Sequence, residues 1–183
     1  DKQITSIIVN GEEKPVSGNL GKVEVNKTLL STTNIQVVYK IIVTNNSELN
    51  GNATIVENIP EGMIMKAEKN IEWKVEENTA KLDTEILSPG ESKEYKVVLD
   101  WTNNSTNVGT KENIVSIETT ENEAGYEEKT INDNESKADL IISIGTGIGV
   151  KTSAISGGII LIVLSSILVV MIDKKRKNKS KQN

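Results

Sequence analysis

Apolar and polar residues alternate in short runs along the first 144 positions, and this alternation restricts the fold more than any other feature of the chain. A period of two places every second side chain on the same face of a strand, so that one face packs and the other meets water. Turn residues separate the runs, as in Asn45-Asn46-Ser47 and Ser88-Pro89-Gly90. The pattern predicts strands at residues 4–9, 23–29, 35–43, 53–59, 71–75, 95–101, 115–117 and 140–144.

No helical period accompanies these runs, which argues against alternating strands and helices. About seven short strands without helices between them are typical of two antiparallel sheets packed face to face. We therefore expect an all-β fold, an immunoglobulin-like antiparallel β-sandwich at residues 21–144. We expect residues 1–20 to form an N-terminal strand and a linker, or the end of a preceding repeat.

Residues 152–172 form an uncharged stretch of 21 residues dominated by Ile, Leu and Val. As an α-helix it would be roughly 31 Å long, which matches a hydrocarbon core of about 30 Å. Basic residues follow directly, and positive segments stay on the cytoplasmic side of a membrane. The sequence predicts a glycine-rich linker at residues 145–151 and then a single transmembrane α-helix, with the N-terminus extracellular and the C-terminus cytoplasmic. The basic residues that flank the span are Lys174, Lys175, Arg176 and Lys177.

The formal net charge of −5 combines two parts of opposite sign. Of the 21 Lys and Arg, 6 lie in the tail at residues 173–183, whereas of the 26 Asp and Glu only Asp173 does. The tail is therefore net basic and suits anionic lipid head groups, so the lipid bilayer is the expected partner. The rest is acidic, which argues against a nucleic-acid partner. A buried core helix of a soluble protein is the alternative to the span.

The chain contains no Cys and no His. This inventory excludes disulfides, Cys/His zinc sites and catalysis by Ser-His-Asp or Cys-His groups. The acidic clusters at residues 121–123 and 133–135 lack the calcium-binding loop with its central Gly. Adjacent glutamates such as Glu12 and Glu13 face opposite sides of a strand, not one cleft. We expect no metal, no cofactor and no enzymatic activity.

Four motifs occur in order along the sandwich. They are a Tyr39-containing strand that ends in Thr44-Asn45, a strand closed by Glu57 before Pro60-Glu61-Gly62, the turn Pro89-Gly90-Glu91, and Asn113 at the start of a late strand. In this order they resemble the domain-of-unknown-function-eleven repeat of Gram-positive surface proteins, over roughly residues 23–144. The resemblance implies a stalk or adhesin module that stacks with neighbouring repeats and holds a binding head away from the cell wall.

From this resemblance we expect a membrane-anchored stalk or spacer at the cell surface. The alternative is an adhesin that itself binds a host protein or glycan, and an exposed aromatic or apolar patch on the Asn-rich loops would favour it. Trp73 and Trp101 have inward parity, so we expect them in the core and not on a sugar-binding surface.

Wall-anchored relatives of such modules carry Leu-Pro-x-Thr-Gly before an apolar span and a basic tail. At residues 143–147 only Thr146 and Gly147 agree with this pentapeptide, and the Pro is missing. We therefore expect this degenerate sorting signal to escape sortase cleavage, so that the protein stays in the membrane.

Three polar residues, Lys27, Glu57 and Asn113, share the parity of inward-facing apolar neighbours. In related surface sandwiches, a Lys amine attacks an Asn amide while a buried acid shuttles the proton, which yields an isopeptide crosslink and ammonia. Burial favours this reaction because it lowers the pKa of Lys and raises that of Glu. The hypothesis makes Lys27 the nucleophile, Glu57 the proton shuttle and Asn113 the acceptor. In the alternative, Lys27 extends to solvent, Glu57 binds the Pro60 turn and Asn113 caps a strand.

Overall fold

The computed structural model describes residues 1–125, 127–128 and 134–145. The described part is built from strands and three short 3-10 helices, η1 (Lys27–Thr32), η2 (Ala67–Lys69) and η3 (Ser105–Asn107). None of the helices in these residues is long and apolar enough to cross a membrane. The expected span at 152–172, the tail at 173–183 and the pair Thr146-Gly147 lie outside the described residues.

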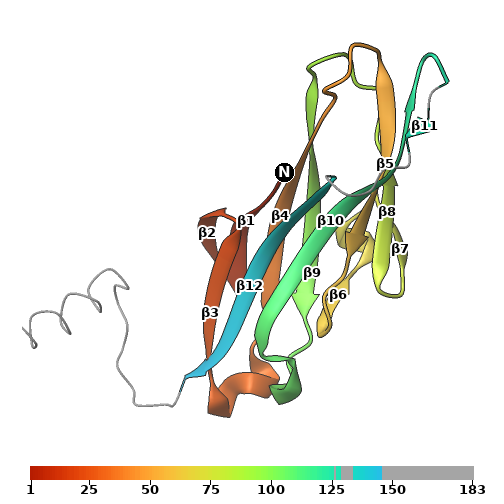
Figure 1. Ribbon diagram of the computed structural model, residues 1–183. Helices are drawn as coiled ribbons and strands as arrows, with labels where there is room; N and C mark the ends of the chain where they lie inside the picture. The colour runs from red at the N-terminus through yellow and green to blue at the C-terminus, as the bar shows by residue number, and fades with distance from the viewer. Residues whose placement is uncertain (126, 129–133, 146–183) are drawn as a thin grey trace, which may run out of the picture. The chain divides into compact units, whose positions relative to one another are not determined.

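Five antiparallel strands form the first sheet, in the order β2-β1-β4-β9-β6 (Figure 1). Their bounds are β1 (Lys2–Val9), β2 (Glu12–Gly18), β4 (Ile35–Thr44), β6 (Met63–Met65) and β9 (Ser92–Trp101).

The second sheet has the order β3-β12-β10-β5-β8-β7, and β11 pairs with β10 outside this path. β3 pairs with β12 in parallel, and the other pairs are antiparallel. The bounds are β3 (Leu20–Asn26), β5 (Gly51–Asn58), β7 (Lys74–Glu76), β8 (Thr79–Asp83), β10 (Gly109–Asn122), β11 (Glu127–Glu128) and β12 (Glu135–Gly145).

The two sheets confirm the all-β sandwich that the alternation predicts. The neighbours β4-β9-β6 in one sheet and β12-β10-β5 in the other follow the B-E-D and G-F-C orders of an immunoglobulin-type sandwich. Each sheet buries one face, as the alternating burial along β4 of the first sheet and β5 of the second shows. The inward residues of β4 are Ile35, Val37, Tyr39, Ile41 and Val43.

Trp73 and Trp101 lie in the core as predicted, each with 5% of its surface exposed. Each indole N–H finds a backbone acceptor, the carbonyl of Lys96 for Trp73 and the carbonyl of Asn107 for Trp101. The bonds satisfy the one polar atom that each large side chain takes into the core. The parity prediction fails for Ile71, which precedes β7 in a turn and is 87% exposed.

Residues 1–20 belong to the sandwich and do not form a separate linker. β1 lies between β2 and β4 inside the first sheet, and its Ile4 and Ile7 are part of the core. A β-bulge between Ile4 and Ser6 shifts the alternation, which explains why the period-two pattern is irregular there. Gly21 of β3 faces these side chains closely: a Cβ at this position would lie 2.8 Å from Ile7 Cδ1 and 3.0 Å from Ile4 Cδ1.

Candidate functional site

Lys2, the first residue of β1, is buried between the two sheets. It shares the inward face of Ile4 and lies opposite Ile41 in the register of β1 and β4. Its backbone N–H donates to Ser136 Oγ of β12 at 2.9 Å, which ties the start of β1 to the second sheet. A buried ammonium needs a partner, because an unpaired charge in the core costs several kcal/mol.

Glu57 of β5 provides that partner from the opposite sheet. Lys2 Nζ donates to Glu57 Oε1 at 2.7 Å and to Oε2 at 2.6 Å, so both carboxylate oxygens accept from the same ammonium. Neither side chain has any exposed surface. The ion pair therefore connects the first sheet to the second in the absence of water.

Asn113 of β10 lies beside this pair. Val115 is directly opposite Glu57 in the register of β10 and β5, so Asn113, two residues away, is a diagonal neighbour of Glu57 on the inward face. Asn113 is fully buried, and neither its Oδ1 nor its Nδ2 makes a hydrogen bond. An unsatisfied buried polar group costs about 1–3 kcal/mol, so the sandwich tolerates a local defect at this amide.

Tyr39 of β4 completes the cluster. Ile4 lies opposite Tyr39 in the register of β1 and β4, so Tyr39 is a diagonal neighbour of Lys2. Lys2 Nζ lies 5.1 Å from the centroid of the Tyr39 ring, a cation–π distance. The Tyr39 hydroxyl is buried and makes no hydrogen bond.

Burial sets the charge balance of the cluster. Desolvation lowers the pKa of Lys2 below its usual value, and the opposing attraction of Glu57 does not offset it. Desolvation likewise raises the pKa of Glu57, against the opposing effects of Lys2 and Asn113. Both shifts favour transfer of a proton from the ammonium to the carboxylate. The products, a neutral amine and a neutral carboxylic acid, are a nucleophile and a proton donor.

Of the three residues expected to form the isopeptide site, the structure corrects the lysine. Glu57 and Asn113 face inward and lie close together, as their parity predicts. Lys27 is exposed, because β3 ends at Asn26, whose side chain accepts a hydrogen bond from Thr28 N and starts η1 at Lys27. Lys2 is the lysine that the fold brings to Glu57. The signal in the sequence is that Lys2 has the same parity as the buried Ile4. The bulge after Ile4 breaks the alternation with the rest of β1, so the pattern does not extend back to Lys2 clearly.

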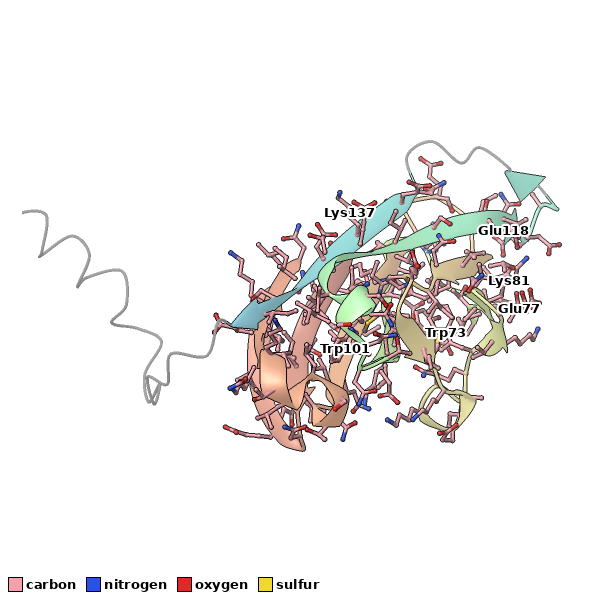
Figure 2. All side chains as sticks on the ribbon, turned by 90° about the horizontal axis from the view of Figure 1, so that it is seen from below. Trp73, Glu77, Lys81, Trp101, Glu118 and Lys137 are labelled. Atoms are coloured by element: carbon pink, nitrogen blue, oxygen red, sulfur yellow. The ribbon has the colours of Figure 1, made fainter. Side chains whose placement is uncertain are left out.

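The outer face of the second sheet carries ion pairs between strands. Lys137 of β12 pairs with Glu112 of the adjacent β10, and Lys81 of β8 reaches across β5 to Glu118 of β10. Figure 2 shows the labelled charged side chains at the periphery of the sandwich and Trp73 and Trp101 within it. The Tyr and Trp residues in the described part of the chain are all buried. That part therefore presents no exposed aromatic platform for a sugar.

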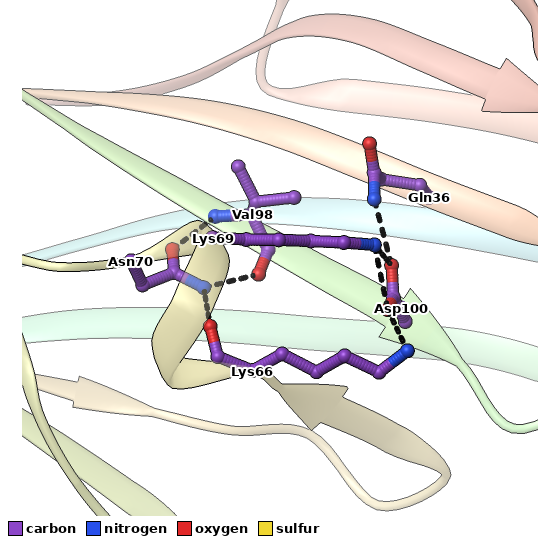
Figure 3. Close-up of polar contacts among 6 residues, drawn as sticks. All are labelled: Gln36, Lys66, Lys69, Asn70, Val98 and Asp100. Atoms are coloured by element: carbon purple, nitrogen blue, oxygen red, sulfur yellow. Dashed lines mark hydrogen bonds and ion pairs between the residues drawn. The ribbon is translucent and has the colours of Figure 1, made fainter.

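A network around Asp100 fixes η2 against β9 (Figure 3). Asp100 pairs with Lys66 at 2.8 Å and Lys69 at 2.9 Å, and it accepts a hydrogen bond from Gln36 Nε2 at 2.8 Å. The buried Asn70 side chain bonds the backbone N–H and C=O of Val98 and the C=O of Lys66. These contacts serve the fold, since every partner belongs to the sandwich itself.

A groove of about 500 Å³ lies at the end of the sandwich that holds the Asn-rich loop at residues 45–50. Its apolar lining comes from Val43, Leu87 and Ile117. Polar side chains also line it, namely Thr44, Asn46, Asn52 and Glu121. Within residues 1–125, 127–128 and 134–145, no group of three or more acidic side chains is placed to hold a metal ion.

No protein-family model matches the sequence, and no curated protein matches it either. Two solved structures that are similar to this chain are BcpA, the major pilin subunit of Bacillus cereus, and a variant of it. The variant has 10% sequence identity and a TM-score of 0.45 over 79% of this chain, and BcpA has 11% identity and a TM-score of 0.44 over 78%. This chain covers only 41% and 40% of the length of those two structures.

Proposed function

We propose that this chain is a non-enzymatic cell-surface module, a stalk or spacer whose two sheets become joined by an isopeptide bond between Lys2 and Asn113. The observation that carries this proposal is the fully buried Lys2–Glu57 pair beside an Asn113 amide that makes no hydrogen bond. The polar outer faces and the buried aromatic residues of the described part support a spacer.

The reaction is balanced without any other reactant. Lys2 Nζ first gives a proton to Glu57, and the neutral amine then attacks Asn113 Cγ. The Nζ–Cγ bond forms, and the Cγ–Nδ2 bond breaks after Glu57 passes its proton to Nδ2. The second proton of the attacking nitrogen returns through Glu57, so that ammonium leaves and Glu57 is regenerated as a carboxylate. The product is a secondary amide from β1 to β10, in place of an ion pair beside an unsatisfied amide.

Intact mass of the full chain tests the bond. The wild type is expected to weigh one ammonia less than its sequence, whereas Lys2→Arg and Asn113→Ala keep the full sequence mass. Lys27→Ala is the matched control, because it removes an exposed lysine and leaves the crosslink in place. A wild type of full sequence mass refutes the crosslink.

Peptide mapping must accompany the mass. Succinimide formation at Asn10-Gly11 or Asn50-Gly51 also releases ammonia, but it does not depend on Lys2. A branched peptide that joins the Lys2 and Asn113 segments identifies the isopeptide. Loss of ammonia without such a branched peptide refutes it.

The anchor is a separate part of this proposal. It rests on the uncharged stretch at residues 152–172 and the basic residues behind it. We expect trypsin added to whole cells to digest the sandwich, and detergent but not high salt to release the protein. A mature protein that ends at Thr146 on the cell wall would instead establish sortase cleavage.

The groove beside the Asn-rich loop favours a second candidate function, an adhesin that binds a host glycan or protein. If the module binds through this groove, then immobilised full-length protein should bind a host glycan or matrix protein saturably, and Asn46→Ala and Asn52→Ala should weaken the binding. Absence of saturable binding on such panels supports the spacer. Lys27→Ala again serves as the control, since Lys27 does not line the groove.

A further inference from the structure

Three buried polar atoms in the cluster make no hydrogen bond: the Tyr39 hydroxyl and the two amide atoms of Asn113. Buried polar groups are nearly always paired, so neighbouring unpaired groups of opposite character require a reason. Tyr39 supplies an O–H donor and Asn113 Oδ1 is an acceptor. Glu57 cannot serve that acceptor in the ion-paired state, because a carboxylate donates no hydrogen bond and both of its oxygens accept from Lys2.

The pairing of β1 with β4 places Tyr39 next to Lys2, the proposed nucleophile. Tyr39 is the diagonal neighbour of Lys2 on adjacent strands, and its ring face lies 5.1 Å from Nζ. Asn113 is a diagonal neighbour of Glu57 on adjacent strands, and Glu57 in turn contacts Lys2. Tyr39 and Asn113 are therefore both neighbours of the Lys2–Glu57 pair in the core.

Attack on Asn113 Cγ moves negative charge onto Oδ1, and a donor aimed at that oxygen lowers the barrier. Glu57 holds one proton after it neutralises Lys2, and that proton is required at Nδ2 for ammonia to leave. A separate donor at Oδ1 stabilises the negative charge from the attack until ammonia leaves, without drawing on the Glu57 proton. We propose that the Tyr39 hydroxyl is this oxyanion donor in Lys2–Asn113 bond formation, which rests on the isopeptide proposed above.

Tyr39 is suited to this role because its proton stays in place. Burial raises the pKa of Tyr39 above its ordinary value, so the hydroxyl donates a hydrogen bond without losing its proton to the amine. No atom of Tyr39 is consumed, and the balance of the reaction does not change. The ring also shields Nζ from water while the amine is neutral.

Pulse-labelled cells that produce the full chain give the rate at which new protein loses ammonia. Tyr39→Phe keeps the ring and removes only the hydroxyl, and we expect crosslinking to slow by on the order of 100-fold, the effect of deleting one oxyanion donor. Tyr95→Phe is the matched control, since it removes another buried hydroxyl without a hydrogen bond, and should crosslink at the wild-type rate.

A purely structural role for the hydroxyl predicts a different result. In the Lys2→Arg background, which cannot crosslink, we expect Tyr39→Phe to leave thermal stability unchanged or raised, since an unsatisfied hydroxyl is removed. Lower stability in that background overturns the inference. A wild-type rate for Tyr39→Phe overturns it and leaves the crosslink intact, whereas a wild type of full sequence mass overturns both.

Discussion

Lys2 and Glu57 are charges that the core accommodates only as a pair. Each shifts the pKa of the other toward its charged form, while desolvation pushes both toward neutrality, and desolvation has the larger effect. Desolvation therefore favours transfer of a proton from Lys2 to Glu57. Burial, and not residue type alone, makes this lysine a candidate nucleophile.

Glu57→Gln should abolish the crosslink, since an amide cannot take the Lys2 proton. It also leaves Lys2 buried without a counter-charge, and removal of one partner of a buried ion pair destabilises by about 3–5 kcal/mol. Intact mass and urea unfolding measure the two effects. Glu94→Gln, at an exposed carboxylate, should change neither by a comparable amount. A Glu57→Gln protein that still loses one ammonia would rule out Glu57 as the proton shuttle.

The lowered pKa of the Asp100 carboxyl group predicts how the stability of the sandwich depends on acid pH. Partial burial tends to raise the pKa of Asp100, but Lys66, Gln36 and Lys69 together lower it below its ordinary value of 3.8. A lowered carboxyl pKa gives stability that is complete above the ordinary pKa and is lost as the pH falls through the folded value. The wild type should therefore lose this contribution below about pH 4, while Asp100→Asn should not.

The contribution of Asp100 should be about 1 kcal/mol or less, because the lysines are largely solvated. Thermal unfolding from pH 6 down to pH 2 measures it, with Glu48→Gln on the exposed loop as control. Equal acid dependence of the wild type and Asp100→Asn would contradict this prediction.

At the scale of elements, the corner between β2 and β3 closes one side of the sandwich. β2 pairs with β1 in the first sheet, and β3 pairs with β12 in the second. The close approach at Gly21 lets Ile4, Ile7 and Leu140 meet in the core beneath this corner. The corner thus connects the two sheets beside β1, the strand that carries Lys2.

Gly21→Val should destabilise the sandwich by about 1–3 kcal/mol, the usual cost of an overpacked core. A smaller loss is expected for Gly21→Ala, because the nearest atoms are the ends of flexible Ile side chains, which can move. Urea midpoints compare these variants with Lys22→Ala, which changes the exposed neighbouring side chain. If the Gly21→Val variant is as stable as the wild type, then the core beneath β3 has unused space and the prediction is wrong.

At the scale of the whole molecule, the proposed bond would join the first strand of one sheet to a central strand of the other. It closes a loop of roughly 110 residues, which by chain entropy corresponds to about 4–5 kcal/mol of stabilisation. Most strands of the described sandwich lie within that loop, whereas β12 and the second half of β10 lie outside it. The stabilisation acts on the unfolded chain, so it does not depend on the contacts of any single strand.

Lys2→Arg should therefore lower the free energy of unfolding by at least about 4 kcal/mol. Arginine keeps a positive charge beside Glu57 but does not form the amide. Thermal and urea unfolding of the full chain in detergent measure the difference, and Lys27→Arg is the control at an exposed site. Equal stability of Lys2→Arg and the wild type would be incompatible with a crosslink between the sheets.

The alternation of apolar and polar residues is enough to predict the layered all-β architecture, because a period of two decides which side chains of a strand can be buried together. The same parity placed Glu57, Asn113, Trp73 and Trp101 inside. It did not identify the lysine. Parity is local: it fails where a strand ends, as at Asn26 before Lys27, or where a bulge interrupts it, as after Ile4.

Which strands face each other across the core follows from the assembled fold and not from the alternation along the chain. The pairing of β1 with β4 brings Lys2 into contact with Glu57, and the pairing of β10 with β5 brings Asn113 beside it. These contacts join residues far apart in the chain, so no short-range pattern encodes them. Their chemistry arises from the exclusion of water between two sheets, which is a property of the assembled sandwich and not of any one segment.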